Sequence, residues 1–513
     1  MKKAIYLIMF TALLVSCKRE QFQEQAMQSG EVLRQKATTV AVPDGDLFSK
    51  EVVDNYVLRT LEDRHDFRWE WADWKMQCSA IQYGDKTVAI GYRTLASKNI
   101  EAELHQINLN SAPWKAVREA LQQFILDELQ KSTGNEVKWE DILVEDDPVL
   151  PIFTLRLPDA SVLTALYNLE NVRYIEPLDY WPGTQAERSS SGCSGSTYTI
   201  NSVDYTSTTP GCLIPWNFTS VGIPTAWNTA QGQGITIGVI DAGISSAQSL
   251  LGSAFNSGSS NVGRTITTGY TFGSSAYTTC SHGTSMCGLA AGPRNSSGAT
   301  TGVAYKSNLH FIRGCEDVML DLSSEKTAVK NALVAMGNHA TVRIVSMSIG
   351  TPFYSSVLYD GVVYAYNKGK MIFAAAGTSY DWLSWWGVVY PAVHPQCIAI
   401  TGVKENSATC DDCHDGSEVD FTVPMERNTN ASRNSLSLPQ SGTWPTYIGG
   451  SSCATATAAG IAALVWSARP TATRSQVFNY LLTTSQYYPS VTSSRGYGNL
   501  NAAAAVNAAV VAN

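Results

Sequence analysis

A run of small residues constrains the fold of this chain more than any other segment. Residues 449–460 read GGSSCATATAAG and lead directly into the apolar stretch Ile461–Ser467. A helix that is apolar on all sides is stable only when it is buried, and side chains this small allow close packing. The sequence therefore predicts a buried core helix whose first turn contains Ser452.

The position of Ser452 also has chemical consequences. Backbone N–H groups in the first helical turn have no intrahelical partner, and the positive end of the helix dipole lies there. Both features stabilise an oxyanion that forms beside the serine hydroxyl. The alternative interpretation is an ordinary serine cap before a core helix, which is common.

An acidic residue follows a predicted strand. From Gly234 the chain reads GITIGVIDAGIS, in which the apolar run Ile235–Ile240 has the length of a buried strand and ends at Asp241. Functional groups collect at the carboxyl ends of strands in parallel α/β sheets. Asp241 is therefore a candidate working carboxylate, although a helix cap is an equal alternative for this residue taken alone.

A histidine precedes a second helix of small residues. Residues 281–292 read SHGTSMCGLAAG, which places His282 at the start of that helix. Small side chains allow the helix to pack closely on a sheet and to hold the imidazole in a fixed position. A single histidine before a helix is more often a surface residue, and the glycine and threonine that follow it favour the functional interpretation.

These motifs, in the order Asp241, His282, Ser452, resemble those of the subtilase family. The resemblance covers roughly residues 215–508. Further segments agree with it in order: Gly302–Ala304, Val345–Gly350, Tyr390–Ala392, Ile398–Val403 and Gly496–Asn501. The resemblance implies an α/β subtilisin-like fold of three layers with a mainly parallel central sheet.

The resemblance also implies a mechanism. The protein would be a serine endopeptidase in which Ser452 attacks the peptide carbonyl, His282 is the general base and Asp241 orients the imidazole. No cofactor is required for that chemistry. The substrate backbone would pair with Ser348, Ile349 and Gly350. The walls of the specificity pocket would be Ala375, Ala376 and Gly377, together with Gly350.

One departure from the family pattern concerns the oxyanion site. The family places an asparagine after the Ala-Ala-Gly of the pocket strand, whereas this chain has Thr378. Two outcomes follow. Thr378 or another donor completes the oxyanion site with Ser452, or the enzyme is slow. The second outcome leads to an alternative function, a catalytically weak or inactive subtilase fold that serves as a surface binding lipoprotein.

Charge density divides the chain. Asp, Glu, Lys and Arg account for 46 of the 165 residues from 18 to 182, but for only 30 of the 325 residues from 189 to 513. This change predicts a domain boundary near the polar stretch Gly183–Ser196. The expected parts are a signal peptide (1–16), a tether with an unassigned segment (17–80), an α+β domain (81–182), a processing loop (183–210) and the catalytic domain (211–513).

The N-terminus predicts export and lipid attachment. Lys2 and Lys3 precede the short apolar stretch Ala4–Val15, which ends in Leu-Val-Ser before Cys17. This pattern resembles a bacterial lipoprotein signal, in which the cysteine becomes the lipidated first residue. We therefore expect a protein of the bacterial cell envelope, anchored to the outer membrane or cell surface through Cys17, with release of the catalytic domain after processing as an open alternative.

The α+β domain resembles an inhibitory subtilase propeptide. Strands and helices alternate from Thr87 to Ile175, and Val172–Pro177 resembles the end of such a domain. The resemblance implies a small ferredoxin-like fold that inhibits the enzyme until self-cleavage. An unrelated α+β module is the alternative. Upstream, the aromatic cluster of Trp69, Trp71 and Trp74 is predicted to be core rather than a ligand site.

Charge and cysteine content set further expectations. The net charge of −8 and the absence of a basic run argue against a nucleic-acid partner. Among the eleven cysteines, Cys193 and Cys212 are the expected disulfide, while Cys287 and Cys453 are expected to be buried thiols.

The segment Cys410-Asp411-Asp412-Cys413-His414 fits a haem-attachment pattern. A loop with a disulfide is the favoured interpretation, because no axial-ligand context accompanies the pattern. The carboxylates of Asp411, Asp412 and Asp415 could hold a structural calcium ion, but their spacing defines no metal site.

Overall fold

The computed structural model describes residues 32–513 except 158, 183–192, 194–198, 379–386 and 513. The predicted signal peptide, Cys17 and residues 183–198 of the predicted processing loop, apart from Cys193, lie outside the described residues. The described residues form two compact units, one within residues 32–47 and 85–177 and the other within residues 48–84 and 178–513.

The first unit is an antiparallel sheet with helices, in the order β2-β3-β1-β4. Its elements follow a βαββαβ sequence, the ferredoxin-like motif. The strands and helices are β1 (Thr87–Tyr92), α4 (Ile100–Glu103), η2 (Leu104–Gln106), α5 (Ala112–Thr133), α6 (Trp139–Ile142), β2 (Leu143–Asp146), β3 (Ile152–Arg156), α7 (Ala160–Tyr167) and β4 (Val172–Pro177).

Residues 48–84 group with the second unit and not with the ferredoxin-like one. They form α2 (Lys50–Arg64), η1 (Trp69–Trp71) and α3 (Trp74–Tyr83). The buried ring of Phe67 packs edge-on against Phe353, with ring centroids 5.9 Å apart, and Tyr390 donates a hydrogen bond to Asp66 (2.7 Å). Trp69 is buried in the same cluster, as predicted, whereas Trp71 and Trp74 are only half-buried and do not belong to it.

A nine-stranded sheet organises the second unit, in the order β15-β14-β13-β12-β11-β10-β7-β9-β8. The strands from β8 to β13 run parallel, and β14 and β15 are antiparallel to their neighbours. Their bounds are β7 (Thr236–Asp241), β8 (Ile266–Tyr270), β9 (Asn308–Arg313), β10 (Val342–Met347), β11 (Met371–Ala375), β12 (Cys397–Lys404), β13 (Phe421–Arg427), β14 (Asn430–Ser437) and β15 (Thr446–Ile448).

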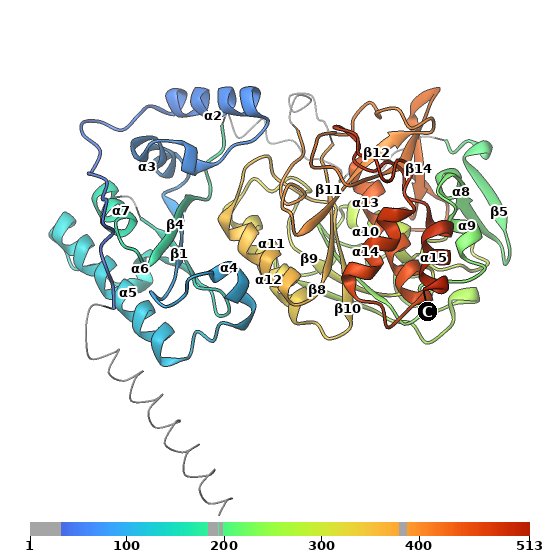
Figure 1. The fold of residues 1–513 in the computed structure, drawn as a ribbon, viewed down its shortest axis with the longest axis horizontal. Helices are drawn as coiled ribbons and strands as arrows, with labels where there is room; N and C mark the ends of the chain where they lie inside the picture. The colour runs from blue at the N-terminus through green and yellow to red at the C-terminus, as the bar shows by residue number, and fades with distance from the viewer. Residues whose placement is uncertain (1–31, 158, 183–192, 194–198, 379–386, 513) are drawn as a thin grey trace, which may run out of the picture. The chain divides into compact units, whose positions relative to one another are not determined.

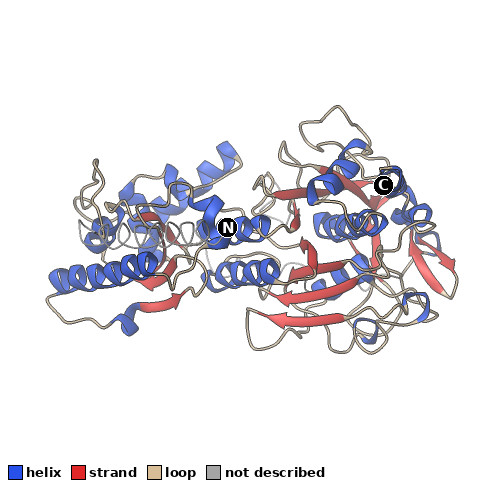
Figure 2. Ribbon diagram, turned by 60° about the horizontal axis from the view of Figure 1, so that its bottom comes forward, coloured by secondary structure: helices blue, strands red, loops and turns tan. Residues whose placement is uncertain are grey.

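Helices cover both faces of this sheet (Figures 1 and 2). Successive strand residues point to opposite faces, so Ile344 joins one hydrophobic core and Val345 the other. The first core includes α10 (His282–Ala291), α13 (Gly450–Ala468), α14 (Arg474–Thr483) and α15 (Ala502–Val511). The second includes α11 (Ser323–Asn338) and α12 (Ser356–Asn367). The predicted three-layer α/β fold is confirmed.

Short elements complete the second unit. They are η4 (Ser202–Asp204), β5 (Tyr205–Thr208), β6 (Cys212–Pro215), α8 (Trp216–Ser220), α9 (Ile223–Ala226), η5 (Ser249–Leu251) and η6 (Gly258–Ser260). The central helix α13 has 19 residues and is apolar enough to cross a membrane, but 83% of its apolar window is buried. It is the core helix that the small-residue run predicts.

Candidate active site

Asp241 is the last residue of β7 and is fully buried. Its carboxylate oxygen Oδ1 accepts a hydrogen bond from the backbone N–H of Ala242 (2.8 Å). A buried carboxylate needs such partners because removal from water disfavours its charge. The carboxyl end of this interior strand thus holds a carboxylate in a fixed orientation.

His282 begins α10 and is 3% exposed. Its Nδ1 lies 2.8 Å from Asp241 Oδ1 and 3.1 Å from Oδ2. The carboxylate only accepts, so Nδ1 carries the hydrogen and Nε2 keeps a free lone pair in the neutral ring. Burial alone lowers the pKa of His282, but the charge and hydrogen bond of Asp241 and the charge of Asp317 outweigh burial and raise this pKa.

Close packing explains why small residues follow the histidine. A Cβ atom at Gly283 would lie 2.2 Å from the carbonyl oxygen of Gly243 and 3.1 Å from Asp241 Oδ1. Any side chain at residue 283 would therefore push α10 away from the strand end. The glycine keeps the imidazole within hydrogen-bond distance of the carboxylate.

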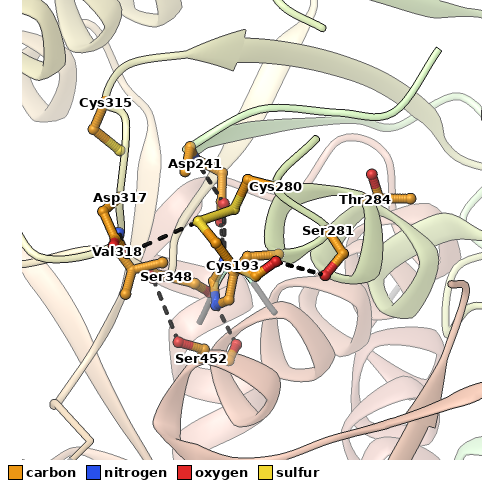
Figure 3. Close-up of polar contacts among 12 residues, drawn as sticks. Cys193, Asp241, Cys280, Ser281, Thr284, Cys315, Asp317, Val318, Ser348 and Ser452 are labelled. Carbon is orange, nitrogen blue, oxygen red and sulfur yellow. Dashed lines mark hydrogen bonds and ion pairs between the residues drawn. A yellow bond between two sulfur atoms is a disulfide. The ribbon is translucent and has the colours of Figure 1, made fainter. Parts of the chain in front are cut away.

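Ser452 is the third residue of α13, which packs against α10. Its hydroxyl donates to the carbonyl oxygen of Ser348 (3.4 Å), and the Ser348 hydroxyl donates to the Ser452 carbonyl oxygen (2.9 Å) (Figure 3). Within the described chain no hydrogen bond joins Ser452 to His282. Catalytic hydrogen bonds are often long before substrate binds, so this geometry is compatible with a serine that turns toward the imidazole.

Thr378 lies beside the start of α13. Its Oγ1 accepts a hydrogen bond from the backbone N–H of Ser451 (3.2 Å) and lies 3.1 Å from Ser451 Oγ. Ser451 Oγ in turn accepts from the N–H of Gly377 (3.1 Å). The Thr378 hydroxyl therefore bonds to Ser451, the residue directly before Ser452.

The expected substrate-binding residues surround one hollow of about 460 Å³ of free space, open to solvent. Ala376 is the exception, because its side chain is buried in the core beneath the hollow. The residues that line the hollow are Val318, Met319, Ser348, Ile349, Gly350, Thr351, Pro352, Ala375, Gly377, Thr378, Val389, His414, Ser451 and Ser452.

Sequence reasoning missed seven of these lining residues, which are Val318, Met319, Thr351, Pro352, Val389, Ser451 and His414. The first six either lie outside any motif or directly adjoin a residue of one. His414, however, belongs to the conspicuous Cys-x-x-Cys-His segment, which the sequence analysis interpreted only as a disulfide loop.

The backbone of Gly350 is already paired. Its N–H donates to the carbonyl of Val318 (2.9 Å), and its carbonyl accepts from the N–H of Leu320 (2.8 Å). Residues 318–320 thus bond to the N–H and carbonyl groups of Gly350, which were expected to pair with an extended peptide. An incoming substrate can use these groups only by displacing that segment.

The expected pairing of Cys193 with Cys212 is wrong. Cys193 forms a disulfide with Cys280, at a Cα–Cα distance of 4.4 Å, and Cys212 is a buried free thiol. Cys212, which is nearer to Cys193 in the sequence, lies on the buried β6. Cys280 is 87 positions from Cys193 and directly precedes Ser281 and His282. Three-dimensional proximity decides the pairing, and spacing along the chain gives no access to it.

The other cysteine expectations agree with the structure. Cys287 and Cys453 are buried free thiols whose pKa values are raised by burial. Cys410 and Cys413 form a disulfide with each other, so neither is available for haem attachment. In the described ranges, no group of three or more His, Cys, Asp or Glu side chains could hold a metal ion.

The fold and the buried pair define an α/β protein with the groups that serine-dependent acyl transfer requires. Residues 232–499 match the profile of the subtilase family. Thermitase of Thermoactinomyces vulgaris is 30% identical over 203 residues, which are 39% of this chain and 66% of thermitase. Subtilisin of Bacillus pumilus is 32% identical over 294 residues, which are 57% of this chain and 98% of that subtilisin. This chain belongs to the subtilase family.

A solved structure agrees with this assignment at the level of the fold. Fervidolysin of Fervidobacterium pennivorans, a keratinolytic enzyme related to subtilisin, is 18% identical with a TM-score of 0.57, over 82% of this chain and 61% of fervidolysin. The alignment covers 66% of the length of thermitase and of subtilisin E of Bacillus subtilis.

Proposed function

We propose that this protein is a serine endopeptidase that hydrolyses peptide bonds through an acyl-enzyme. The observation that carries the proposal is the buried hydrogen bond between Asp241 and His282, on a helix packed against the one that bears Ser452. Family membership supports the same reaction class.

The proposed reaction has two halves. Ser452 Oγ attacks the scissile carbonyl while His282 Nε2 takes the hydroxyl proton, and Asp241 stabilises the imidazolium. Collapse of the tetrahedral intermediate breaks the C–N bond, and His282 gives the proton to the leaving amine. Water then attacks the acyl-enzyme with His282 again as base, which releases the acid and restores Ser452.

Labelling with a fluorophosphonate tests the proposal directly. Such probes form an adduct only with an activated serine, so the processed protein should be labelled and a Ser452→Ala variant should not. Absence of an adduct after the precursor has been cleaved between residues 183 and 196 would favour the alternative, a catalytically weak subtilase fold used for binding. The engagement of Thr378 with Ser451 is the observation that keeps this alternative open.

The pH profile follows from the charge state of His282. Only the neutral imidazole accepts the serine proton, so kcat/KM should fall as pH falls through the pKa of His282. Since that pKa is raised, the inflection is expected above the ordinary histidine value of about 6.5. Asp317→Asn removes a negative charge that raises the pKa and should shift the inflection to lower pH. An unshifted inflection would contradict this role of Asp317.

Thr378 is proposed to turn its hydroxyl from Ser451 to the oxyanion when substrate binds. Thr378→Val removes the hydroxyl at nearly constant shape and should lower kcat by roughly 10²-fold with little change in KM. Thr378→Asn restores the family's usual donor and should leave kcat within about tenfold of the native enzyme. If instead Thr378→Asn raised kcat a hundredfold at constant KM, the native site would lack a donor.

Substrate is proposed to bind in extended form against Ser348–Gly350, by exchange with residues 318–320. Backbone hydrogen bonds of the added strand would supply affinity, as in other β-augmentation complexes. The displaced hydrogen bonds of Gly350 reduce the net gain.

The protein is also proposed to be made as a lipid-anchored precursor. Cys17 would carry the lipid, the ferredoxin-like unit would inhibit the enzyme, and cleavage between residues 183 and 196 would activate it. The signal-like N-terminus and the βαββαβ topology of residues 85–177 support this proposal. N-terminal sequencing of active protein, combined with detection of lipid on the fragment that contains Cys17, tests both parts.

A further inference from the structure

The Cys-x-x-Cys-His segment brings His414 to the substrate hollow. The disulfide between Cys410 and Cys413 closes this short loop. Cys413 forms an antiparallel bridge with Thr378, and the N–H of His414 donates to the carbonyl of Gly377 (3.0 Å). The loop is therefore attached to the same segment that walls the hollow.

Two glycines make room for this arrangement. A Cβ atom at Gly377 would lie 2.4 Å from His414 Nδ1, and Gly377 also has a φ of +123°, which side chains rarely allow. A Cβ atom at Gly402 would lie 2.6 Å from the sulfur of Cys413. The His414 imidazole thus packs directly on the backbone of Gly377. A larger residue at 377 or 402 would clash with the ring or with Cys413 and displace the loop.

The hydrogen bonds of His414 fix its tautomer. Nδ1 lies 3.0 Å from the carbonyl oxygen of Gly387, which can only accept, so Nδ1 carries the hydrogen. Nε2 then presents a lone pair. His414 is 4% exposed, and its Nε2 has no hydrogen-bond partner among the described residues. A buried polar atom without a partner carries a free-energy cost.

The hydroxyl groups in the hollow are otherwise engaged. Ser348 and Ser452 bond to each other's carbonyl oxygens, Thr378 and Ser451 bond to each other, and Thr351 accepts from a backbone N–H (3.4 Å). None of the residues found to line the hollow is Asp, Glu, Lys or Arg. His414 lines the hollow, and its Nε2 is a buried polar side-chain atom without a hydrogen-bond partner among the described residues. Nε2 is covered in the free protein, so a ligand reaches it only by displacing the atoms that cover it.

The charge state of the ring follows from its surroundings. Burial lowers the pKa of His414, and the hydrogen bond to Gly387 and the charge of Asp415, which act in the opposite direction, do not reverse the shift. The ring is therefore neutral at pH 7, and its free nitrogen is an acceptor.

We propose that His414 determines substrate specificity: its Nε2 accepts a hydrogen bond from a neutral donor on the P1 side chain, the residue that supplies the scissile carbonyl. The proposal rests on the proposed peptidase function, because Ser452 and His414 line the same hollow. A substrate whose carbonyl lies at Ser452 places its adjoining side chain there. Side chains with an amide or hydroxyl donor satisfy the buried nitrogen, whereas apolar side chains of the same size leave it unpaired.

The first test uses the active enzyme and peptides that differ only at P1. The matched pairs are glutamine against methionine, asparagine against leucine, and tyrosine against phenylalanine. For at least one pair, kcat/KM should be roughly 10- to 100-fold higher for the donor-bearing member, because the apolar partner leaves a buried acceptor unpaired. Ratios near one for all three pairs would overturn the proposal without any variant.

The second test compares two variants of the hollow. His414→Leu removes the acceptor at similar size and should bring the donor-to-apolar ratio close to one, chiefly through loss of activity on the donor-bearing peptide. Val389→Ala enlarges the same hollow and should shift the size preference while the ratio of matched pairs persists. A ratio that survives His414→Leu would assign the preference to another group.

Two further outcomes separate the inference from the proposed function. Preference for glutamate or aspartate at P1 would mean a protonated ring and would overturn the neutral-acceptor proposal. Cleavage of no peptide by protein that fluorophosphonate also fails to label would overturn the peptidase function, and this inference with it. Labelled, active protein without donor preference would overturn the role of His414 alone.

Discussion

Replacement of Ser452 by alanine is expected to lower kcat for peptide hydrolysis by about 10⁶-fold, the loss known for the nucleophile of subtilisin, a member of the same family. The physical reason is that no acyl-enzyme can form once Oγ is absent. Ser452 Oγ makes one weak hydrogen bond, to Ser348 (3.4 Å), so its removal should hardly affect stability. Single-turnover kinetics with a fluorogenic peptide measure the loss.

The same substitution tests self-processing. A full-length Ser452→Ala protein should remain a single uncut chain, while the parent is cut before the catalytic domain. Addition of catalytic amounts of active enzyme distinguishes cleavage within a molecule from cleavage between molecules. A Ser452→Ala protein that matured at the normal rate in the absence of other proteases would exclude Ser452 as the processing nucleophile.

Replacement of Asp241 by asparagine is expected to lower kcat by about 10⁴-fold. The carboxylate accepts the Nδ1 hydrogen of His282 at 2.8 Å, whereas an amide can present an N–H there and stabilise the wrong tautomer. The variant also removes the main charge that opposes the effect of burial on the His282 pKa. The acidic inflection of the residual activity should therefore move to lower pH.

Asp317→Asn is the matched control for Asp241→Asn. It removes a carboxylate that raises the same pKa, but one that makes no hydrogen bond to His282 among the described contacts. It should shift the pH profile in the same direction and leave the plateau of kcat within about tenfold, far from the loss expected for Asp241→Asn. Equal losses in the two variants would mean that field strength, rather than tautomer control, sets the role of Asp241.

The elements that carry the site could be predicted from sequence because local patterns determine them. An apolar run followed by an acid gave the end of β7 at Asp241, and small-residue motifs gave the starts of α10 and α13 near His282 and Ser452. In each case the residue type and its neighbours along the chain contain the required information.

Contacts between distant segments could not be predicted in this way. Gly350 pairs with residues 318–320, Cys193 pairs with Cys280, and His414 enters the hollow through a loop bound to Gly377. Each contact joins segments separated by tens of residues, and each depends on the paths of loops that have no periodic pattern. The association of residues 48–84 with the second unit could not be predicted either, because it also depends on contacts between segments far apart in the sequence.

The disulfide between Cys193 and Cys280 has a consequence for the fate of the precursor. Cys193 falls within the segment 183–196, where cleavage is proposed, and Cys280 lies two residues before His282. A cut before residue 193 would leave the fragment proposed to carry lipid joined to the second unit only through non-covalent contacts, such as that between Phe67 and Phe353. A cut after residue 193 would leave a two-chain molecule in which that fragment is also attached covalently, two residues before His282. The position of one peptide bond relative to one cysteine would thus decide whether release of the enzyme also depends on the redox state of its surroundings.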